Sequence, residues 1–233
     1  MIYKFAPKAN YEDFASGRVL YHMQGFTNFP VRLICEVFMR CFSLINKPSA
    51  VVYDPCCGSG YMLTVLKFLY GSHIDTLIAS DVSEEAVNLT KKNFGLLSHA
   101  GLDMRKEQLQ DLHTRFKRDS YLEAIKSAER LKGLIGEGAF ESLVFKRDIL
   151  VDKSDYKADL ILCDVPYGIK TAWSGEGDDF INRMLDNVWD NLNAVGVAAI
   201  FSDKKQKIIT EKYKRAEKVL IGKRKFEIYV KLK

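Results

Sequence analysis

The segment Asp54–Gly60 (Asp-Pro-Cys-Cys-Gly-Ser-Gly) joins an apolar, β-branched run to a helix-like apolar pattern over Met62–Tyr70. Glycine lets the backbone come close to a ligand, and the first amide groups of a helix have no partner within the helix. A strand, a glycine-rich turn and a helix in this order are typical of the opening unit of a nucleotide-binding α/β fold. The segment therefore predicts a nucleotide-type ligand at the end of a first strand.

The residues around this turn argue against a phosphate-bearing ligand. Leu63 stands where a dinucleotide fingerprint has its third glycine, and no Lys-Ser or Lys-Thr pair follows the turn as in a P-loop. Asp54, before the turn, suits a positive or hydrogen-bond-donating group such as the ammonium of an amino acid. Asp81 ends the next predicted strand, 21 residues after Gly60, where an acid can accept from ribose hydroxyls. A ligand with an amino-acid end and a ribose, but no phosphate, is S-adenosylmethionine.

A second group of polar residues, Asp164-Val165-Pro166-Tyr167, ends the apolar run Ala158–Cys163. Proline restricts the backbone, so the carbonyl of Val165 and the side chain of Asp164 can face the same side as acceptors for an amide-like or base-like N–H edge. Tyr167 offers a flat ring on which a base could stack. Asp164 would take the proton of a ring nitrogen that is methylated, or hydrogen-bond to it without full proton transfer.

Alternating strand and helix patterns surround these motifs. The first helix starts near Pro30 and is predicted to bury one face, made of Val31, Ile34, Cys35, Phe38, Cys41 and Phe42. Strands are predicted at 50–54, 74–80, 140–145, 158–163, 196–201, 217–221 and 226–232, and helices at 83–97, 180–192 and, rich in lysine, 204–214. The alternation predicts a Rossmann-like α/β fold with a seven-stranded, mostly parallel sheet, helices on both faces and an antiparallel C-terminal strand.

The regular alternation is interrupted over about 98–138. Leucine and other apolar residues recur there among dense charges of both signs, which predicts a pair of amphipathic helices. Packing over the ligand and surface elaboration are both open roles for this helical insertion. We expect residues 1–48 to form an N-terminal extension with its helix, and residues 49–233 to form the main domain that carries the insertion.

Positive charge is concentrated at the end of the chain. Residues 204–233 contain twelve Lys or Arg against three Glu, whereas the other 203 residues carry 23 basic and 27 acidic groups. A basic lobe on a slightly acidic body favours a polyanion bound at one end, although solvated lysines without a partner explain the composition equally well.

Composition excludes several other classes of protein. Hydrophobic residues make up 47% of the 233, and no run approaches the length of a membrane helix or a secretory signal, so we expect a cytoplasmic protein that does not bind membranes. The five cysteines match neither a disulfide framework nor paired zinc-binding motifs, and no metal site is predicted.

These motifs resemble those of class I S-adenosylmethionine-dependent N-methyltransferases. The residues that carry the resemblance are Asp54-Pro55-Cys56-Cys57-Gly58-Ser59-Gly60-Tyr61, Asp81 and Asp164-Val165-Pro166-Tyr167-Gly168. More narrowly, Gly17-Arg18-Val19-Leu20, Phe29-Pro30-Val31-Arg32-Leu33 and the Cys-Cys turn resemble the AviRa-type avilamycin-resistance ribosomal RNA methyltransferases. The resemblance implies an antibiotic-resistance type of enzyme that uses S-adenosylmethionine to methylate a guanine nitrogen, ring N1, of large-subunit ribosomal RNA.

The same resemblance implies a role for each candidate residue. Asp54, Gly58 and Gly60 would hold the methionine end of the cofactor, Asp81 the ribose, and Asp148 the adenine amine beside Ile149, unless Asp148 only caps the following segment. The cofactor set is Asp54, Cys56, Gly58, Gly60, Asp81, Val82, Asp148 and Asp164; the catalytic set is Asp164, Pro166 and Tyr167. The substrate set is Arg32, Val165, Tyr167, Lys204, Lys205, Lys223, Arg224 and Lys225, with the basic residues on RNA phosphates. Asn93 is a further candidate.

Other functions fit part of these motifs. Enzymes that methylate a protein glutamine or a DNA adenine use a similar Asp/Asn-Pro-Pro-Tyr motif, in which this chain has Val165 at the first proline position. A nucleic-acid-binding module without activity would need broken sites, whereas these motifs are intact. An NAD-linked oxidoreductase disagrees with Leu63 and Asp54.

Overall fold

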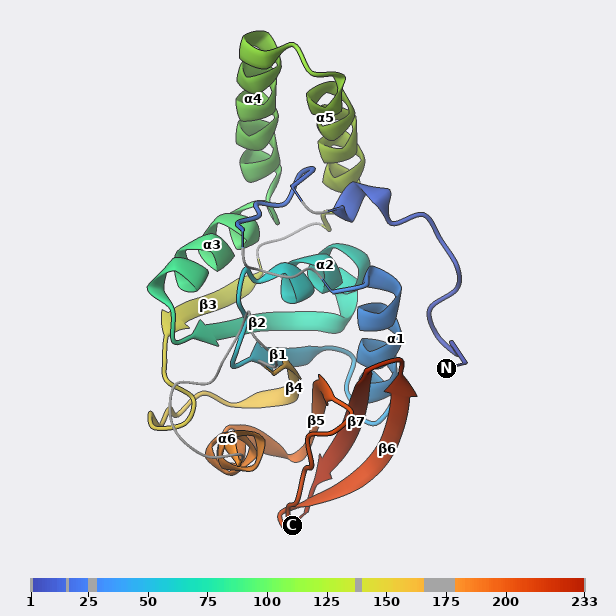
Figure 1. Cartoon of the computed structure of the whole chain (residues 1–233), viewed down its shortest axis with the longest axis vertical. Helices are drawn as coiled ribbons and strands as arrows, with labels where there is room; N and C mark the ends of the chain where they lie inside the picture. Colours follow the sequence, from blue (N-terminus) through green and yellow to red (C-terminus); the bar gives the residue numbers. More distant parts are fainter. Residues whose placement is uncertain (1, 16, 25–28, 137–139, 166–178, 233) are drawn as a thin grey trace.

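A seven-stranded mixed sheet lies at the centre of the computed structural model, which describes residues 2–15, 17–24, 29–136, 140–165 and 179–232 (Figure 1). In this part of the chain the strand order is β3-β2-β1-β4-β5-β7-β6. The strands are β1 (Ala50–Asp54), β2 (Ile74–Asp81), β3 (Glu141–Lys146), β4 (Ala158–Asp164), β5 (Leu192–Asp203), β6 (Tyr213–Ile221) and β7 (Arg224–Lys231). Each predicted strand is present in this sheet.

The sheet is parallel from β3 to β5 and becomes antiparallel at β7. Strand β7 pairs antiparallel with both β5 and β6, so the C-terminal hairpin closes one side of the sheet. The predicted mostly parallel sheet with an antiparallel C-terminal strand is confirmed. Because β7 runs against β5, its first residue, Arg224, lies beside Asp203 at the edge where the parallel strands end.

Alternate residues of the strands pack into two separate apolar layers, as expected for a sheet covered on both faces. Val52 and Leu160 belong to the layer that includes α1 (Val31–Phe42) and α2 (Tyr61–Tyr70). Tyr53 and Ile161 belong to the opposite layer, which includes α6 (Phe180–Val188). The helix α3 (Glu84–Gly95) packs against β2 and β3.

The helix boundaries follow local signals in the sequence. The helix α1 begins directly after Pro30 and buries the predicted face, with Phe42 only half-buried. Ser83 caps α3, since its side chain accepts a hydrogen bond of 3.3 Å from the Ala86 amide. That helix ends at Gly95, two residues before the predicted boundary.

The insertion forms the predicted helix pair, α4 (His99–Phe116) and α5 (Asp119–Lys132), which projects from the sheet as a hairpin (Figure 1). Contacts with the N-terminal segment hold its base. Arg105 donates to the carbonyl of Val19 at 2.9 Å, and Arg130 forms a two-fold hydrogen bond with Asp13 in the short helix η1 (Glu12–Phe14). The hairpin is therefore fixed to the body instead of being a free appendage.

The predicted lysine-rich helix at 204–214 is wrong. After β5 the chain turns and runs without helix to Tyr213, where β6 begins. Tyr213 is buried, packs edge-on against Trp189 and Tyr229, and donates to the carbonyl of Leu185 at 2.8 Å. These contacts accompany the pairing of Tyr213 with Lys231 of β7, and tertiary packing overrides local helix propensity here. The two C-terminal strands accordingly begin earlier than predicted, at Tyr213 and Arg224.

The described residues contain no disulfide, no metal-binding cluster and no membrane-spanning helix. All five cysteines are unpaired thiols, and no group of three or more His, Cys, Asp or Glu side chains in this part of the chain could hold a metal ion. No helix within the described ranges is long and apolar enough to cross a membrane. A short helix, η2 (Gly71–His73), completes the elements found there.

Candidate functional site

Three of the predicted site carboxylates stand at the C-terminal ends of neighbouring parallel strands. Asp54 ends β1, Asp81 ends β2 and Asp164 ends β4, and β1 lies between the other two in the sheet. Ligands of open α/β sheets bind at this edge of the sheet. The structure thus brings together the two motifs that lie more than a hundred positions apart in the chain.

Asp54 is buried, with 2% of its surface exposed. Its Oδ1 accepts a hydrogen bond of 3.0 Å from the Cys56 amide, which shapes the turn after β1. Burial raises the pKa of Asp54 well above its usual value, and the charges of Asp164 and Asp81 raise it further. Burial and the two neighbouring carboxylates thus disfavour the ionised form of Asp54, whereas a bound cation favours it, so this position suits a positively charged ligand group.

Asp81 connects the glycine-rich turn to the start of α3. Its Oδ2 accepts from the Gly58 amide at 2.9 Å, and its Oδ1 accepts from the Ser83 amide at 3.0 Å. Burial raises the pKa of Asp81, and these backbone hydrogen bonds oppose the rise. Val82, directly beside it, exposes 51% of its surface, which leaves an apolar side chain at this edge of the sheet.

The glycine-rich turn is packed against α3 through Thr90, a residue that sequence reasoning missed. Gly60 has φ +68°, and a Cβ there would lie 2.6 Å from Thr90 Cγ2. Thr90 Oγ1 donates to the Gly58 carbonyl at 3.0 Å and lies 3.3 Å from Cys57 Sγ. Glycine is therefore required at position 60 for both its backbone conformation and its size.

Asn93, a further candidate for the site, is buried behind the turn. Its side-chain amide donates to the carbonyls of Ser59 (2.8 Å) and Tyr21 (3.0 Å), and its Oδ1 accepts from the Tyr21 amide (2.7 Å). All these partners are backbone groups, so Asn93 connects the turn to the N-terminal segment. Thr90 and Asn93 lie three positions apart on α3, a spacing that places both on one helix face.

Arg32, a predicted substrate contact, faces the N-terminal segment. Its Nε donates to the carbonyl of Ala6 at 2.9 Å, and its guanidinium carbon lies 3.8 Å from the centre of the Tyr3 ring. These contacts hold residues near the chain start against α1.

Asp148 caps the turn that follows β3. Its Oδ1 accepts from the Leu150 amide at 2.9 Å, while Asp152 Oδ2 accepts from the Asp148 amide at 2.8 Å. Arg147 holds the same turn against β1. It is buried and donates to the Asp152 carbonyl and the Tyr53 hydroxyl, both at 2.9 Å. Asp148 therefore has the capping role that the sequence left open. Arg147 is a positioning residue that sequence reasoning missed.

The second motif meets the C-terminal hairpin at Arg224. An Nη atom of Arg224 donates to Asp164 Oδ1, and the two side chains also form an ion pair. Burial raises the pKa of Asp164 to about 7, and the charge of Arg224 lowers it. Val165 is buried, with its amide donating to the Phe201 carbonyl at 3.1 Å. Pro166 and Tyr167 lie outside the described residues.

The four lysines predicted to contact phosphates divide into two groups. Lys204, Lys205 and Lys223 are exposed, and the Lys204 amide donates to the Lys223 carbonyl at 3.0 Å, so they lie together at one end of the C-terminal hairpin. Lys225 is 2% exposed, and its ammonium binds the Gln206 carbonyl and Glu227. The ammonium of Lys225 is thus enclosed by acceptors of the protein itself, and its contact with RNA stays a prediction.

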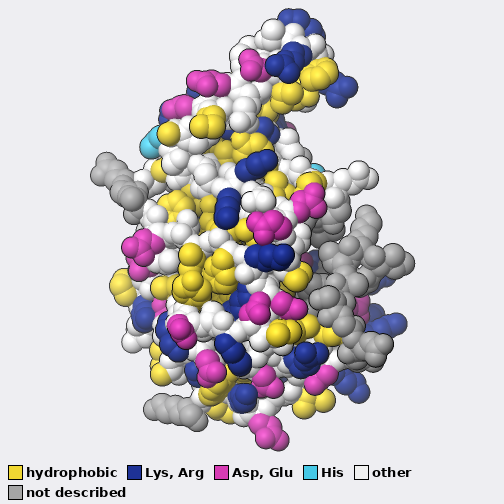
Figure 2. All heavy atoms as spheres, turned by 90° about the vertical axis from the view of Figure 1, so that its left-hand side faces the viewer, with side chains coloured by type: hydrophobic (Ala, Val, Ile, Leu, Met, Phe, Trp, Pro, Cys, Tyr) yellow, Lys and Arg dark blue, Asp and Glu magenta, His cyan; other side chains and the backbone are white. Residues whose placement is uncertain are grey.

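The surface charge is mixed on the face drawn in Figure 2. Lysine and arginine side chains alternate there with aspartate and glutamate instead of forming one continuous positive surface. Near the base of the α4–α5 hairpin, cations form ion pairs with neighbouring carboxylates: Lys132 pairs with Asp103, and Arg130 pairs with Asp13. On this face, therefore, positive charge is not separated from negative charge.

Comparison with known proteins places this geometry in a family. A family model described as rRNA methyltransferase AviRa matches residues 1–224. A relative from Streptomyces viridochromogenes, the 23S rRNA (guanine(2535)-N(1))-methyltransferase, is 36% identical over 222 residues, which are 91% of this chain and 88% of the relative. A solved structure of rRNA methyltransferase AviRa from the same organism matches with a TM-score of 0.87 and 32% identity, over 99% of this chain and 96% of that chain.

More distant structures share only the fold. A putative methyltransferase, yhhF, from Escherichia coli matches with a TM-score of 0.55 at 12% identity, over 89% of each chain. A putative methylase from Haemophilus influenzae matches with a TM-score of 0.53 at 14% identity. The resemblance first noted in the motifs extends over the whole fold, and the chain belongs to the AviRa family of rRNA methyltransferases.

Proposed function

We propose that this chain transfers the methyl group of S-adenosylmethionine to ring N1 of a guanine in 23S ribosomal RNA. The observation that carries the proposal is the 36% identity, over 91% of the chain, to a relative named for that reaction. The site fits the reaction, because Asp54, Asp81 and Asp164 end neighbouring strands at the edge where such folds bind ligands.

The cofactor fits the chemistry of the first motif. Asp54 has two anions as neighbours, so the ammonium of the methionine end would relieve repulsion there, and Gly58 and Gly60 let the backbone approach it. Asp81 would accept from the ribose hydroxyls, with Val82 and Ile149 against the adenine and Asp148 on its amine. Cys56 and Asp164 complete the set. The bound cofactor supplies an electrophilic methyl group on a sulfonium.

The substrate base would be turned out of its RNA stack to reach this edge of the sheet. Asp164 would accept the N1 hydrogen, the carbonyl of Val165 would take a second N–H group, and Tyr167 would stack on the base after Pro166 orients the motif. Lys204, Lys205 and Lys223 would hold phosphates without reading sequence. Arg32 is left out of this set, since its guanidinium is engaged by Ala6 and Tyr3.

The test is methylation followed by mapping of the product. The protein and labelled S-adenosylmethionine are incubated separately with 23S RNA, 50S particles, DNA and a protein extract, and labelled RNA is digested for mass spectrometry. We expect label in RNA, on one guanine, as the N1-methyl base. Label in DNA or protein only, or on another base of the RNA, would contradict the proposal.

A further inference from the structure

We infer that Arg224 is a catalytic residue of this reaction: its guanidinium binds O6 of the target guanine and stabilises the negative charge that develops there while Asp164 takes the N1 proton. The inference rests on the proposed function, because it names the guanine edge as the partner of these two side chains. It also separates Arg224 from the neighbouring lysines, with which the sequence grouped it as a phosphate contact.

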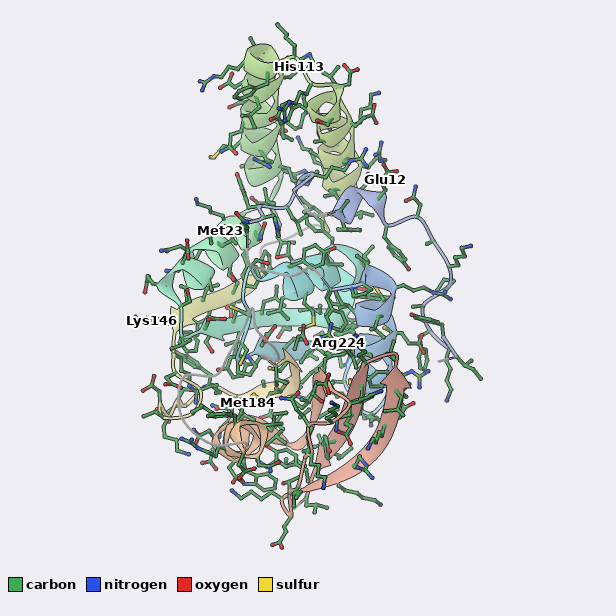
Figure 3. All side chains as sticks on the ribbon, viewed as in Figure 1. Glu12, Met23, His113, Lys146, Met184 and Arg224 are labelled. Atoms are coloured by element: carbon green, nitrogen blue, oxygen red, sulfur yellow. The ribbon has the colours of Figure 1, made fainter. Side chains whose placement is uncertain are left out.

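The topology brings Arg224 to the reacting edge of the sheet. Arg224 is the first residue of the antiparallel strand β7 and pairs with Asp203, the last residue of β5. The neighbouring strand β4 ends at Asp164, which pairs with Phe201. Only β5 separates the two strands, and Figure 3 shows the labelled Arg224 near the end of β4. An Nη atom of Arg224 donates a hydrogen bond to Asp164 Oδ1, past the end of β5.

The orientation of Arg224 is set by aromatic packing. Its guanidinium carbon lies 4.5 Å from the centre of the Phe29 ring, and that ring in turn packs 4.4 Å from the Phe201 ring. A guanidinium stacked on a fixed aromatic ring keeps its plane and its donors in one direction. The charged group is therefore held in place before a substrate arrives, as electrostatic stabilisation of a transition state requires.

The two side chains of the pair are half-buried. The Arg224 and Asp164 side chains are 27% and 24% exposed, and Asp164 Oδ2 has no hydrogen-bond partner among the described residues. Lys223, the preceding residue, is exposed. An exposed cation such as Lys223 is enough to contact a phosphate. Arg224 is half-buried and paired with Asp164, and this arrangement suits the hydrogen-bonding edge of a base.

The donors and acceptors of the pair match the guanine edge. Guanine presents the N1–H donor next to the O6 acceptor, and Asp164 with Arg224 presents an acceptor next to a donor. When N1 loses its proton to the Asp164 carboxylate, the electron pair left on the ring is shared with O6. That nitrogen then forms the N–CH3 bond as the S–CH3 bond breaks, so the sulfonium becomes a neutral thioether. A cation at O6 is needed only while this charge exists, so it accelerates the chemical step.

The experiment measures kcat and KM for methyl transfer with Arg224→Gln, Arg224→Lys, Asp164→Asn and the double variant Asp164→Asn/Arg224→Gln. Lys223→Gln is the matched control, because it removes the same charge from the same turn. Cofactor affinity by calorimetry and melting temperature show that each variant is folded. We expect Arg224→Gln to lower kcat by about 100-fold or more, as for loss of one donor to a developing oxyanion. Arg224→Lys should recover part of the loss, and Lys223→Gln should raise only the KM for RNA.

The double variant distinguishes direct contact with the base from an effect through Asp164. If Arg224 binds O6 itself, adding Arg224→Gln to Asp164→Asn lowers single-turnover transfer by a further ten-fold or more. Equal rates for Asp164→Asn and the double variant would overturn the inference, since Arg224 would then act only by placing the carboxylate. A change in KM alone, as in Lys223→Gln, would make Arg224 a phosphate contact. If the wild-type protein does not methylate guanine, the proposed function itself fails.

Discussion

Gly60 lies so close to Thr90 that a Cβ on the glycine would stand 2.6 Å from the Thr90 Cγ2 atom. Both the positive φ of Gly60 and this contact oppose any side chain, so Gly60→Ala should lower the free energy of unfolding by about 3 kcal/mol. Urea denaturation measures the change. Gly71→Ala is the control, since Gly71 has a helical backbone and free space around it, and should leave stability unchanged or slightly raised. Equal effects of the two substitutions would contradict the packing argument.

Asp81→Ala should weaken S-adenosylmethionine binding by about 100-fold. The variant loses the proposed acceptor for the ribose hydroxyls and also releases the Gly58 and Ser83 amides, and two hydrogen bonds to a charged group are together worth about 3 kcal/mol. Calorimetry measures the affinity. Asp75→Ala removes an exposed carboxylate from the other end of the same strand and should bind as the wild type does. Unchanged affinity in Asp81→Ala would remove Asp81 from the site.

Asp164→Asn should lower methyl transfer at saturating S-adenosylmethionine by about 100-fold or more, because an amide cannot take the N1 proton. The pKa of Asp164, raised to about 7 by burial although Arg224 lowers it, also sets the pH dependence. Only the ionised carboxylate accepts a proton, so the wild-type rate should rise as the pH passes through about 7. The measurement is a pH profile of kcat for both proteins. A wild-type profile that stays flat from pH 6 to 8, or full turnover by the variant, would rule out the proton-accepting role.

The same carboxyl group should make folding stability depend on pH. Because burial raises the pKa of Asp164 to about 7, the folded state binds this proton more tightly than the unfolded state. The resulting stability is fully present below the usual carboxyl range and is lost as the pH rises through about 7. The melting temperature of Asp164→Asn, relative to wild type, should therefore increase between pH 5 and pH 8. A difference that stays constant, or decreases, would show that Asp164 is ionised without penalty.

Glu36 should show the opposite dependence on pH. It is buried in α1, which raises its pKa, but it accepts from the backbone amides of Lys4, Phe5 and Ala6 and from Arg40, and the net pKa is lowered. The contribution of Glu36 to folding stability is thus present above the usual carboxyl range and lost as the pH falls.

Glu36→Ala should cost about 3–5 kcal/mol of folding stability at pH 7, because the Arg40 charge and three amides lose a buried partner. Glu107→Ala, on the exposed side of α4, should change stability by less than about 0.5 kcal/mol. Urea denaturation at pH 7 and pH 4 measures both variants; a small cost at pH 7 would contradict the buried network.

The sequence alone was sufficient to place the parts of the candidate site that depend on local order. Asp54, Asp81 and Asp164 each follow an apolar strand pattern, and the C-terminal ends of parallel strands lie at one edge of a sheet. The positions of these three residues therefore followed from periodicity and turn signals. The helical insertion could be predicted for the same reason, since amphipathic periodicity is a property of neighbouring residues.

The tertiary structure decided which side chains meet across the sheet. Arg224 and Lys225 are adjacent and equally basic in the sequence, yet the alternation of β7 places Arg224 on Asp164 and encloses Lys225 beside Glu227. The predicted lysine-rich helix is likewise absent: the chain runs irregularly up to Tyr213, which pairs with Lys231 of β7. Such contacts join residues far apart in the chain, and they are selected by burial and strand register, which no local pattern of residues specifies.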